Sequence, residues 1–440
     1  MITRENTKTL YDLLKNAGTE YASKIFLKYE KAEVFYCNTY SELYKDSCSF
    51  GAWVSEQGDC PHVALLGKCS YRYLNALFGT VSAGGIAVPI DIKAGTRGII
   101  ERINQADTDI LLYDWDFHDE IDLYKSECSG VKEFICIQNM TEQSVHNICK
   151  SYRNNSFEPK SKEDECALII FTSGTTGKGK GVMLSHGNLI DNIFNSTEVE
   201  KQDNEVAMNV LPIHHVFCLS GDVFLTMRYG SKLCLCPDVS KLFHYITVFR
   251  PTVLRCVPMI SKTIYNRIVM MHRKKREVTR RQIKDELLGP DFHKIISGGG
   301  YLAKDLALNL IGLGITIGQG YGMSECSPKI AAPDYERLEK LDSVGRLVEG
   351  CQVRFVEGEI QVKSPSVMMG YYNDEELTKE ALTEDGWLCT GDLGYVDDED
   401  FLYLTGRKKN LIILSNGENV APEGIENMFD DEVLIKDILV

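Results

Sequence analysis

Apolar and polar positions follow two different rhythms along the first third of the chain. Short apolar runs, which are typical of buried strands, occur at residues 25–29, 62–66, 84–89, 108–113 and 133–137. Residues 70–83 are instead predicted to form a helix. Strands that alternate with helices form parallel sheets with helices on both faces. The pattern therefore predicts an α/β fold.

Polar segments and turns divide the rest of the chain. Residues 150–165 are polar and charged, and we interpret them as a loop between two α/β subdomains, about 1–160 and 161–340. Residues 341–408 contain short strands with turns, which predict a β-rich subdomain.

Composition narrows the class of partner. The net charge of −15 argues against nucleic acid or an anionic membrane, because both select an excess of Lys and Arg. The basic window 273–284 is interpreted as a solvated helix face. No apolar run approaches the ~18 residues of a transmembrane segment, and the N-terminus has no signal-peptide pattern. Fifteen scattered cysteines, interpreted as reduced thiols, indicate a cytoplasmic protein.

One loop carries the strongest chemical signal. Residues 171–181 read Phe-Thr-Ser-Gly-Thr-Thr-Gly-Lys-Gly-Lys-Gly, between an apolar run at 166–171 and a segment at 182–194 that has helical spacing after Gly187. Glycines let backbone N–H groups approach oxygen atoms closely, hydroxyls add donors and lysines add positive charge. This combination predicts a polyphosphate-binding loop.

Two nucleotide-binding interpretations compete for this loop. Gly174, Gly179 and Lys180 have the spacing of a Walker A loop, but Gly181 stands where that loop needs a hydroxyl for Mg²⁺. The second interpretation is the adenylate-forming family, whose phosphate loop the segment resembles at residues 172–177 and at Lys180-Gly181. The family's usual proline before the lysine is Gly179 here.

Further motifs favour the second interpretation. They are Ser297-Gly-Gly-Gly-Tyr-Leu302, Tyr321-Gly-Met-Ser-Glu325, Thr390-Gly-Asp392 and Gly406-Arg-Lys-Lys409, in the family's order and at roughly its spacing. The whole chain resembles the adenylate-forming (AMP-binding) acyl-CoA synthetase family, and residues 405–423 are most similar to fatty acyl-CoA ligases. The resemblance implies a ligase that forms acyl-AMP and pyrophosphate from ATP and a carboxylic acid. The acyl group is then transferred to the thiol of CoA or of a carrier-protein pantetheine.

The resemblance also implies roles for individual residues, with ATP or AMP, Mg²⁺ and CoA as cofactors. The residues expected to hold the phosphates are Thr172, Ser173, Gly174, Thr175, Thr176, Gly177 and Lys180. Those expected around the adenosine are Gly299, Gly300, Tyr321, Gly322, Asp392 and Arg407. Those expected at the reacting groups are Ser324 at the α-phosphate, Glu325 and Thr176 at Mg²⁺, His215 at the acyl site and Gly417 at the pantetheine.

One departure from the family pattern concerns the C-terminal lid domain. The resemblance implies a large N-terminal domain over residues 1–408 and a second domain that begins with residues 409–440. The family's hinge matches Lys409, and 440 − 409 = 31 residues follow it. The lid is therefore expected to be almost entirely missing from this sequence, and its lysine for the carboxylate and α-phosphate has no counterpart. We expect the chain to bind ATP or AMP and to adenylate slowly.

The sequence leaves alternatives open for the identity of the acid and for the class of reaction. Gly318 and Gly320 are expected to leave room on the wall of the acyl pocket, which favours a fatty or aryl acid. An adenylation domain that loads another acid onto a carrier protein is the nearest alternative. A P-loop kinase or NTPase would release ADP, and a non-catalytic nucleotide-binding protein would release nothing.

Overall fold

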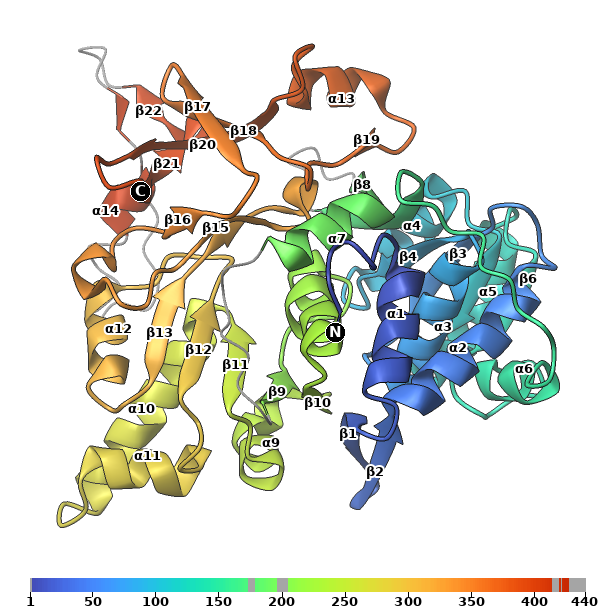
Figure 1. The fold of residues 1–440 in the computed structure, drawn as a ribbon, viewed down its shortest axis with the longest axis horizontal. Helices are drawn as coiled ribbons and strands as arrows, with labels where there is room; N and C mark the ends of the chain where they lie inside the picture. Colours follow the sequence, from blue (N-terminus) through green and yellow to red (C-terminus); the bar gives the residue numbers. More distant parts are fainter. Residues whose placement is uncertain (1, 173–178, 196–204, 414–418, 421, 427–440) are drawn as a thin grey trace.

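In this computed structural model, the described residues are 2–172, 179–195, 205–413, 419–420 and 422–426. Their core is built on two large sheets, seen in Figure 1 on the two sides of the molecule. The first sheet has the strand order β13-β12-β11-β9-β10-β1-β2, and its strands are parallel except for the pair β1–β2. The bounds are β1 (Ile25–Lys31), β2 (Val34–Thr39), β9 (Val206–Asn209), β10 (Lys232–Leu235), β11 (Val253–Cys256), β12 (Lys294–Ser297) and β13 (Thr316–Gln319).

The second sheet has the order β19-β8-β7-β4-β3-β5-β6. Its strands from β7 to β6 are parallel, and β8 and β19 join the edge in antiparallel fashion. The bounds are β3 (His62–Leu66), β4 (Ile86–Ile90), β5 (Ile110–Tyr113), β6 (Glu133–Cys136), β7 (Cys166–Thr172), β8 (Lys180–Ser185) and β19 (Gly370–Tyr371). Parallel sheets with helices on their faces confirm the predicted α/β class.

The helices begin where the sequence supplies side-chain caps. Thr9 caps α1 in a reciprocal capping box with Asp12, and the hydroxyl of Ser70 accepts from the backbone N–H of Tyr73 at the start of α3. The bounds are α1 (Leu10–Glu20), α2 (Tyr40–Val54), α3 (Tyr71–Ser82), α4 (Gly95–Gln105), α5 (Ile121–Glu127), α6 (Val145–Ser151), α7 (His186–Phe194), α8 (Leu225–Tyr229), α9 (Leu242–Phe249), α10 (Pro258–Lys274), α11 (Arg280–Leu288), α12 (Lys304–Ile311), α13 (Glu375–Ala381) and α14 (Pro422–Glu426).

The helical spacing that follows Gly187 belongs to α7, and the residues before this helix form a strand that the sequence did not predict. Residues up to Ser185 belong to β8, which pairs with β7 in the register Ile170↔Val182. The helix starts at His186 because Ser185 and Asn188 form a capping box there. The phosphate-loop segment therefore connects two antiparallel strands instead of a strand and a helix.

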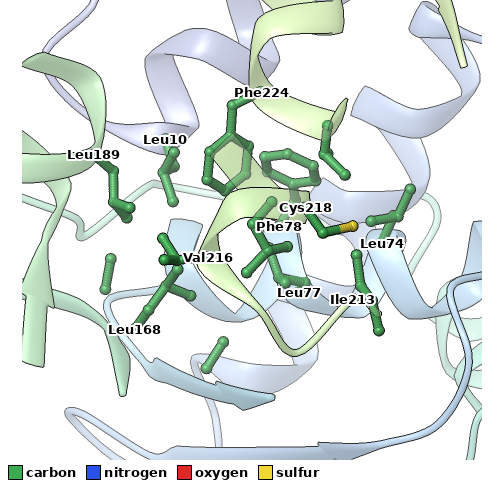
Figure 2. Packing of buried hydrophobic residues seen from close by; sticks show 14 of the residues in the cluster. Leu10, Leu74, Leu77, Phe78, Leu168, Leu189, Ile213, Val216, Cys218 and Phe224 are labelled. Atoms are coloured by element: carbon green, nitrogen blue, oxygen red, sulfur yellow. The ribbon is translucent and has the colours of Figure 1, made fainter. Parts of the chain in front are cut away.

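A continuous apolar layer lies between the two sheets. Figure 2 shows Phe78 of α3 and Phe224 facing one another beside Leu10 of α1 and Leu189 of α7. The two phenyl rings meet edge to face with centroids 5.9 Å apart. Fully burying side chains of this size stabilises the fold by about 1.5–3 kcal/mol each. This layer fixes the segment from Ile213 to Phe224, which carries the candidate acyl-site histidine.

The β-rich part lies above the two large sheets in Figure 1. One sheet has the order β14-β15-β16 and another has the order β17-β18-β20-β21. The bounds are β14 (Tyr321–Gly322), β15 (Lys329–Ala332), β16 (Arg346–Leu347), β17 (Gln352–Val356), β18 (Glu359–Lys363), β20 (Leu388–Val396), β21 (Leu402–Arg407), β22 (Ile412–Ile413) and β23 (Asn419–Val420). The hinge expected at Lys409 lies in a 3₁₀ turn over Lys408–Asn410.

The sheets do not follow the expected division near residue 160. The hairpin β1–β2 joins the sheet of β9–β13, and β7, β8 and β19 join the sheet of β3–β6. The boundaries of independently folding domains stay a prediction. Each of the fifteen cysteines, all within the described part of the chain, is a free thiol. None of the helices among the described residues has both the length and the apolar character needed to cross a membrane.

Candidate nucleotide site

The ends of the predicted phosphate loop lie side by side at one edge of the second sheet. Thr172 ends β7 and Lys180 begins β8, and the two residues pair across the antiparallel ladder. Ser173, Gly174, Thr175, Thr176 and Gly177 lie outside the described residues. A Walker A loop joins a strand to a helix whose N-terminus faces the phosphates. The strand-to-strand connection therefore contradicts the Walker interpretation.

Helix α4 borders the C-terminal end of this loop. The side-chain amide of Gln105 donates to the carbonyl oxygen of Gly179 at 2.9 Å. A Cβ atom at Gly179 would lie 3.2 Å from Cδ1 of Phe171 and 3.7 Å from Nε of Arg102. The glycine that replaces the family's proline is thus held by contacts from β7 and α4.

Lys180 and Glu325 both contact the side chain of Tyr371. The Tyr371 hydroxyl donates to Oε1 of Glu325 at 2.8 Å, and Nζ of Lys180 lies 5.4 Å from the centroid of the Tyr371 ring. Glu325 is 7% exposed, and burial together with the Glu325 charge raises the pKa of Tyr371 well above its usual range. The structure brings together the predicted phosphate-binding lysine and the predicted metal-binding carboxylate.

Gly322 and Ser324 stand at the turn that precedes Glu325. A Cβ atom at Gly322 would lie 2.0 Å from the carbonyl oxygen of Pro328, so only glycine allows β14 and β15 to approach this closely. Ser324 is half-buried at the start of a 3₁₀ turn over Ser324–Cys326. The close approach of β14 and β15 places this turn.

Asp392 receives donors from two directions. The Tyr321 hydroxyl donates to Oδ2 at 2.6 Å, and Nε of Arg407 lies 3.1 Å from Oδ1. Burial and the Asp392 charge raise the pKa of Tyr321 far above its usual range, so its proton stays on the phenol. A carboxylate offers about four lone-pair sites, which leaves acceptor capacity on both oxygens for two further hydroxyl donors.

A pocket of about 290 Å³ opens at this carboxylate, lined by Thr390, Gly391, Asp392, Arg407, Lys408 and Lys409. Glu359 holds two of these lining residues. Its two carboxylate oxygens accept from the backbone N–H of Gly391 and from Nζ of Lys408, each at 3.0 Å. The basic rim and the buried carboxylate suit a ligand with both hydroxyl groups and negative charge.

Gly299 and Gly300 follow the end of β12 and are exposed, as close approach of a ligand requires. Gly299 has φ +73°, a left-handed conformation that favours glycine. A Cβ atom there would meet nothing closer than Cγ1 of Val257 at 3.8 Å, so the space is open. The preceding Gly298 packs under Phe217 of the histidine segment, which places that segment next to the glycine run.

The two histidines at 214 and 215 differ in environment. His214 is buried with Nε2 3.7 Å from Oδ1 of Asp91, whereas His215 is exposed and its ring centroid lies 4.2 Å from that of His214. Burial and the neighbouring His215 lower the pKa of His214 to about 4. His214 is therefore neutral at pH 7, and His215 is the histidine available to a ligand.

The expected space beside Gly318 is filled. A Cβ atom on Gly318 would lie 2.5 Å from Cβ of Pro333, and one on Gly320 would lie 3.2 Å from the carbonyl oxygen of Ala331. The expectation that these glycines widen an acyl pocket is wrong, because neighbouring chain already occupies the space. They permit close packing of β13 and β15 instead.

The residues present fit Mg²⁺ bound together with a nucleotide. Among the residues that the structure describes, no cluster of three or more His, Cys, Asp and Glu side chains could hold a metal ion alone. Mg²⁺ in nucleotide sites is held by one or two carboxylates and by phosphate oxygens. Glu325 supplies such a carboxylate, and the second predicted ligand, Thr176, lies outside the described residues.

A larger cavity of about 690 Å³ lies away from these residues, at the carboxyl ends of β3 and β5 and beside the hairpin β1–β2. Figure 1 places that hairpin at the opposite end of the molecule from β20 and β21. Charged residues that line the cavity form ion pairs with one another. Arg72 pairs with Asp46 at 2.9 Å, and Lys68 pairs with Asp116 at 2.8 Å. Because Arg72 and Lys68 are already paired with carboxylates, and the predicted nucleotide-binding residues do not line this cavity, we do not assign the nucleotide to it.

Comparison with known proteins identifies the family. The sequence profile described as AMP-binding enzyme matches residues 15–372. The chain belongs to the AMP-binding enzyme family.

Named relatives of this AMP-binding enzyme are CoA ligases. A 2-succinylbenzoate–CoA ligase of Bacillus cytotoxicus is 32% identical over 86% of this chain and 73% of its own length. A long-chain-fatty-acid–CoA ligase of Mus musculus is 26% identical over 85% of this chain, which spans 65% of that relative's length. A solved structure of O-succinylbenzoate coenzyme A synthetase from Bacillus subtilis, in complex with AMP, is 26% identical, with a TM-score of 0.76, and the match covers 95% of this chain and 82% of that chain.

Sequence reasoning missed Tyr371 in this AMP-binding enzyme. It lies 46 positions from Glu325, in Gly370-Tyr-Tyr-Asn-Asp374, outside the motifs that marked the site. Its place depends on β19 pairing with β8, which no local pattern of the sequence reveals. Gly417 lies outside the described residues.

Proposed function

We propose that the protein activates a carboxylic acid with ATP, forming acyl-AMP and pyrophosphate, and then transfers the acyl group to the thiol of CoA. The observation that supports this proposal is that the chain contains two groups of contacting charged and polar residues. Lys180 and Glu325 meet at Tyr371, and Asp392 receives Tyr321 and Arg407. The first centre suits a metal-bound polyphosphate, and the second suits a ribose.

The first step attacks the α-phosphate with the substrate carboxylate. A carboxylate is a poor electrophile. Its oxygen forms a bond to the α-phosphorus while the bond to the β-phosphate breaks and pyrophosphate leaves, so the acyl carbon then carries AMP, a good leaving group for the later attack by the CoA thiol. Lys180 neutralises charge on the departing phosphates, and Ser324 donates to the α-phosphate. Mg²⁺, when bound at Glu325, neutralises further phosphate charge.

The nucleoside is held apart from the reacting atoms. Asp392 accepts from the two ribose hydroxyls through its remaining lone pairs, and Arg407 neutralises the carboxylate or contacts the phosphate. The adenine lies between Tyr321 and the exposed Gly299-Gly300 backbone. Binding energy from adenosine then positions the α-phosphate for in-line attack.

The acid is proposed to be a fatty or aryl acid, entering beside His215. The support is that the named relatives act on a long-chain fatty acid and on 2-succinylbenzoate. CoA is preferred over carrier-protein pantetheine because these relatives are CoA ligases. Free cysteines fit a reducing compartment, so we propose that the reaction takes place in the cytoplasm.

Mass spectrometry of products tests the reaction class. The protein is incubated with Mg-ATP and a pool of fatty and aryl acids, with and without CoA, and AMP binding is measured in parallel by calorimetry. Acyl-AMP without CoA, and acyl-CoA with AMP in its presence, are the expected products. Formation of ADP in place of AMP would contradict the proposal, as would failure to bind AMP.

A further inference from the structure

Tyr371 joins the two charged residues on which the phosphate end of the proposed site depends. Its hydroxyl donates to Oε1 of Glu325 at 2.8 Å, and its ring faces the ammonium group of Lys180 at 5.4 Å. The side chain is buried, with 6% of the residue exposed. A buried tyrosine with a donor end and a π face can orient an anion and a cation at once.

We propose that Tyr371 is a positioning residue for the metal-bound phosphates: its hydroxyl orients Glu325 towards the cation, and its ring orients Lys180 towards the β- and γ-phosphates. This inference rests on the proposed function and names the residue that couples its two charged groups. Tyr371 itself contacts neither the substrate nor the cation.

The hydroxyl of Tyr371 restricts the orientation of the Glu325 carboxylate. A glutamate side chain has three rotatable bonds, and a cation that keeps near-ideal octahedral geometry tolerates little movement of its ligand. The bond from Tyr371 engages Oε1, and we assign Oε2 to the cation. The backbone of Glu325 is fixed separately, because its carbonyl oxygen accepts from the N–H of Met368 at 2.9 Å. Main chain and carboxylate are thus both held by the segment from Met368 to Tyr371.

That segment is also hydrogen-bonded to β8, the strand that begins with Lys180. Tyr371 pairs with Val182 in β8, two positions after Lys180, and the N–H of Tyr372 donates to the carbonyl oxygen of Gly181 at 2.7 Å. The N–H of Tyr371 donates to Oγ1 of Thr378 at 2.9 Å, which ties the strand to α13. Hydrogen bonds to β8 and to α13 therefore hold Tyr371 between Lys180 and Glu325.

Three variants separate the hydroxyl, the ring and the strand. Tyr371→Phe removes the hydroxyl and keeps the ring, and Tyr371→Leu removes both. Tyr372→Phe is the matched control, because Tyr372 is the next residue and its hydroxyl donates to Asp107 at 2.9 Å, away from Glu325. Thermal unfolding of each variant checks that the fold is retained.

The measurements are the affinities for Mn²⁺ in the presence of ATP, by electron paramagnetic resonance, and for metal-free ATP and AMP, by calorimetry. Tyr371→Phe is expected to weaken Mn²⁺ binding about tenfold, the effect of losing one hydrogen bond to a charged group, with AMP and metal-free ATP unchanged. Tyr371→Leu is expected to weaken metal-free ATP as well, because Lys180 loses the ring. Tyr372→Phe is expected to match the wild type.

The outcomes separate this inference from the proposed function. Wild-type affinity for Mn²⁺ in Tyr371→Phe would overturn the positioning role, and so would an equal loss of AMP affinity, which a purely structural role predicts. If Tyr371→Leu fails to fold, the Tyr371→Phe comparison alone decides. Absence of AMP binding by the wild-type protein would instead overturn the proposed function, and this inference with it.

Discussion

The hydroxyl of Tyr321 donates to Oδ2 of Asp392 at 2.6 Å, although the two residues lie 71 positions apart. Tyr321 belongs to β14 and Asp392 to β20, so the bond connects two different sheets. Both residues are buried, at 8% and 7% exposure. A hydrogen bond to a buried charged group contributes more than one between neutral groups, so this contact fixes the candidate ribose acceptor and also stabilises the fold.

Removing the Tyr321 hydroxyl tests its effect on nucleotide binding and its effect on the stability of the fold. Tyr321→Phe keeps the ring and leaves Asp392 with Arg407 as its charged neighbour. The free energy of unfolding, measured by urea denaturation, is expected to fall by about 1–3 kcal/mol, because a buried charged acceptor loses a donor. AMP affinity is expected to fall by less than about tenfold, since about 1 kcal/mol corresponds to orienting one acceptor. Unchanged stability and affinity would mean that this bond does not form in solution.

Removing the carboxylate itself is expected to cost far more binding. Asp392→Ala deletes both proposed ribose contacts, each worth about 1.5–3 kcal/mol when charge-assisted, so AMP affinity should fall at least about a hundredfold. Asp398→Ala is the matched control, because Asp398 is an exposed aspartate beyond the end of the same strand. Calorimetric titration with AMP distinguishes the two variants. Equal affinities would refute the assignment of Asp392 to the ribose.

The sequence predicted the parts of the fold that depend on local patterns. The strand at residues 62–66 has the same bounds in β3, because a continuous apolar run in a parallel sheet is buried on both faces. The helix predicted at 70–83 is α3, one residue shorter at each end, because Ser70 is its cap. In each case the residues that decide the structure are neighbours in the sequence.

Long-range pairing explains what the sequence did not predict. Residues 180–185 were not predicted as a strand, because their strand character comes from pairing with β7. Gly318 was expected to open a pocket, and Pro333, from a later strand connection, fills that space. Tyr371 reaches Glu325 only after β19 adds to β8. Ordered motifs located the candidate site, whereas the groups that hold those motifs in place came from the tertiary structure.

The buried His186 predicts how stability depends on pH. Its Nδ1 accepts from the backbone N–H of Leu10 at 3.2 Å, and burial lowers the pKa of His186 to about 4. The unfolded chain, with a histidine pKa near 6.5, takes up a proton that the folded protein does not. Stability therefore falls as pH decreases from about 6.5 to about 4 and is then level. The contribution of His186 over this window is about 3 kcal/mol.

An amide at this position removes the titration and keeps an acceptor. His186→Asn is expected to be less stable than the wild type at pH 7 but to lose less stability between pH 6.5 and pH 4. Urea denaturation across that range measures the slope for each protein. An unchanged slope in His186→Asn would contradict a buried neutral imidazole.

A single methyl group at Gly322 is expected to damage stability and nucleotide binding together. The added Cβ of Gly322→Ala would lie 2.0 Å from the carbonyl oxygen of Pro328, which is backbone and cannot rotate away. Strands β14 and β15 are then expected to separate, displacing Tyr321 in β14 and the turn that contains Glu325. Overpacking of this kind costs about 1–3 kcal/mol and sometimes more, and AMP affinity should fall with it.

Gly312→Ala is the control, because the nearest atoms to its Cβ lie at 3.5 Å and its backbone is right-handed helical. Its stability should be unchanged or raised by about 0.4–1 kcal/mol. Thermal unfolding with and without AMP measures both effects, and a Gly322→Ala protein as stable as Gly312→Ala would show that the two strands are not this close.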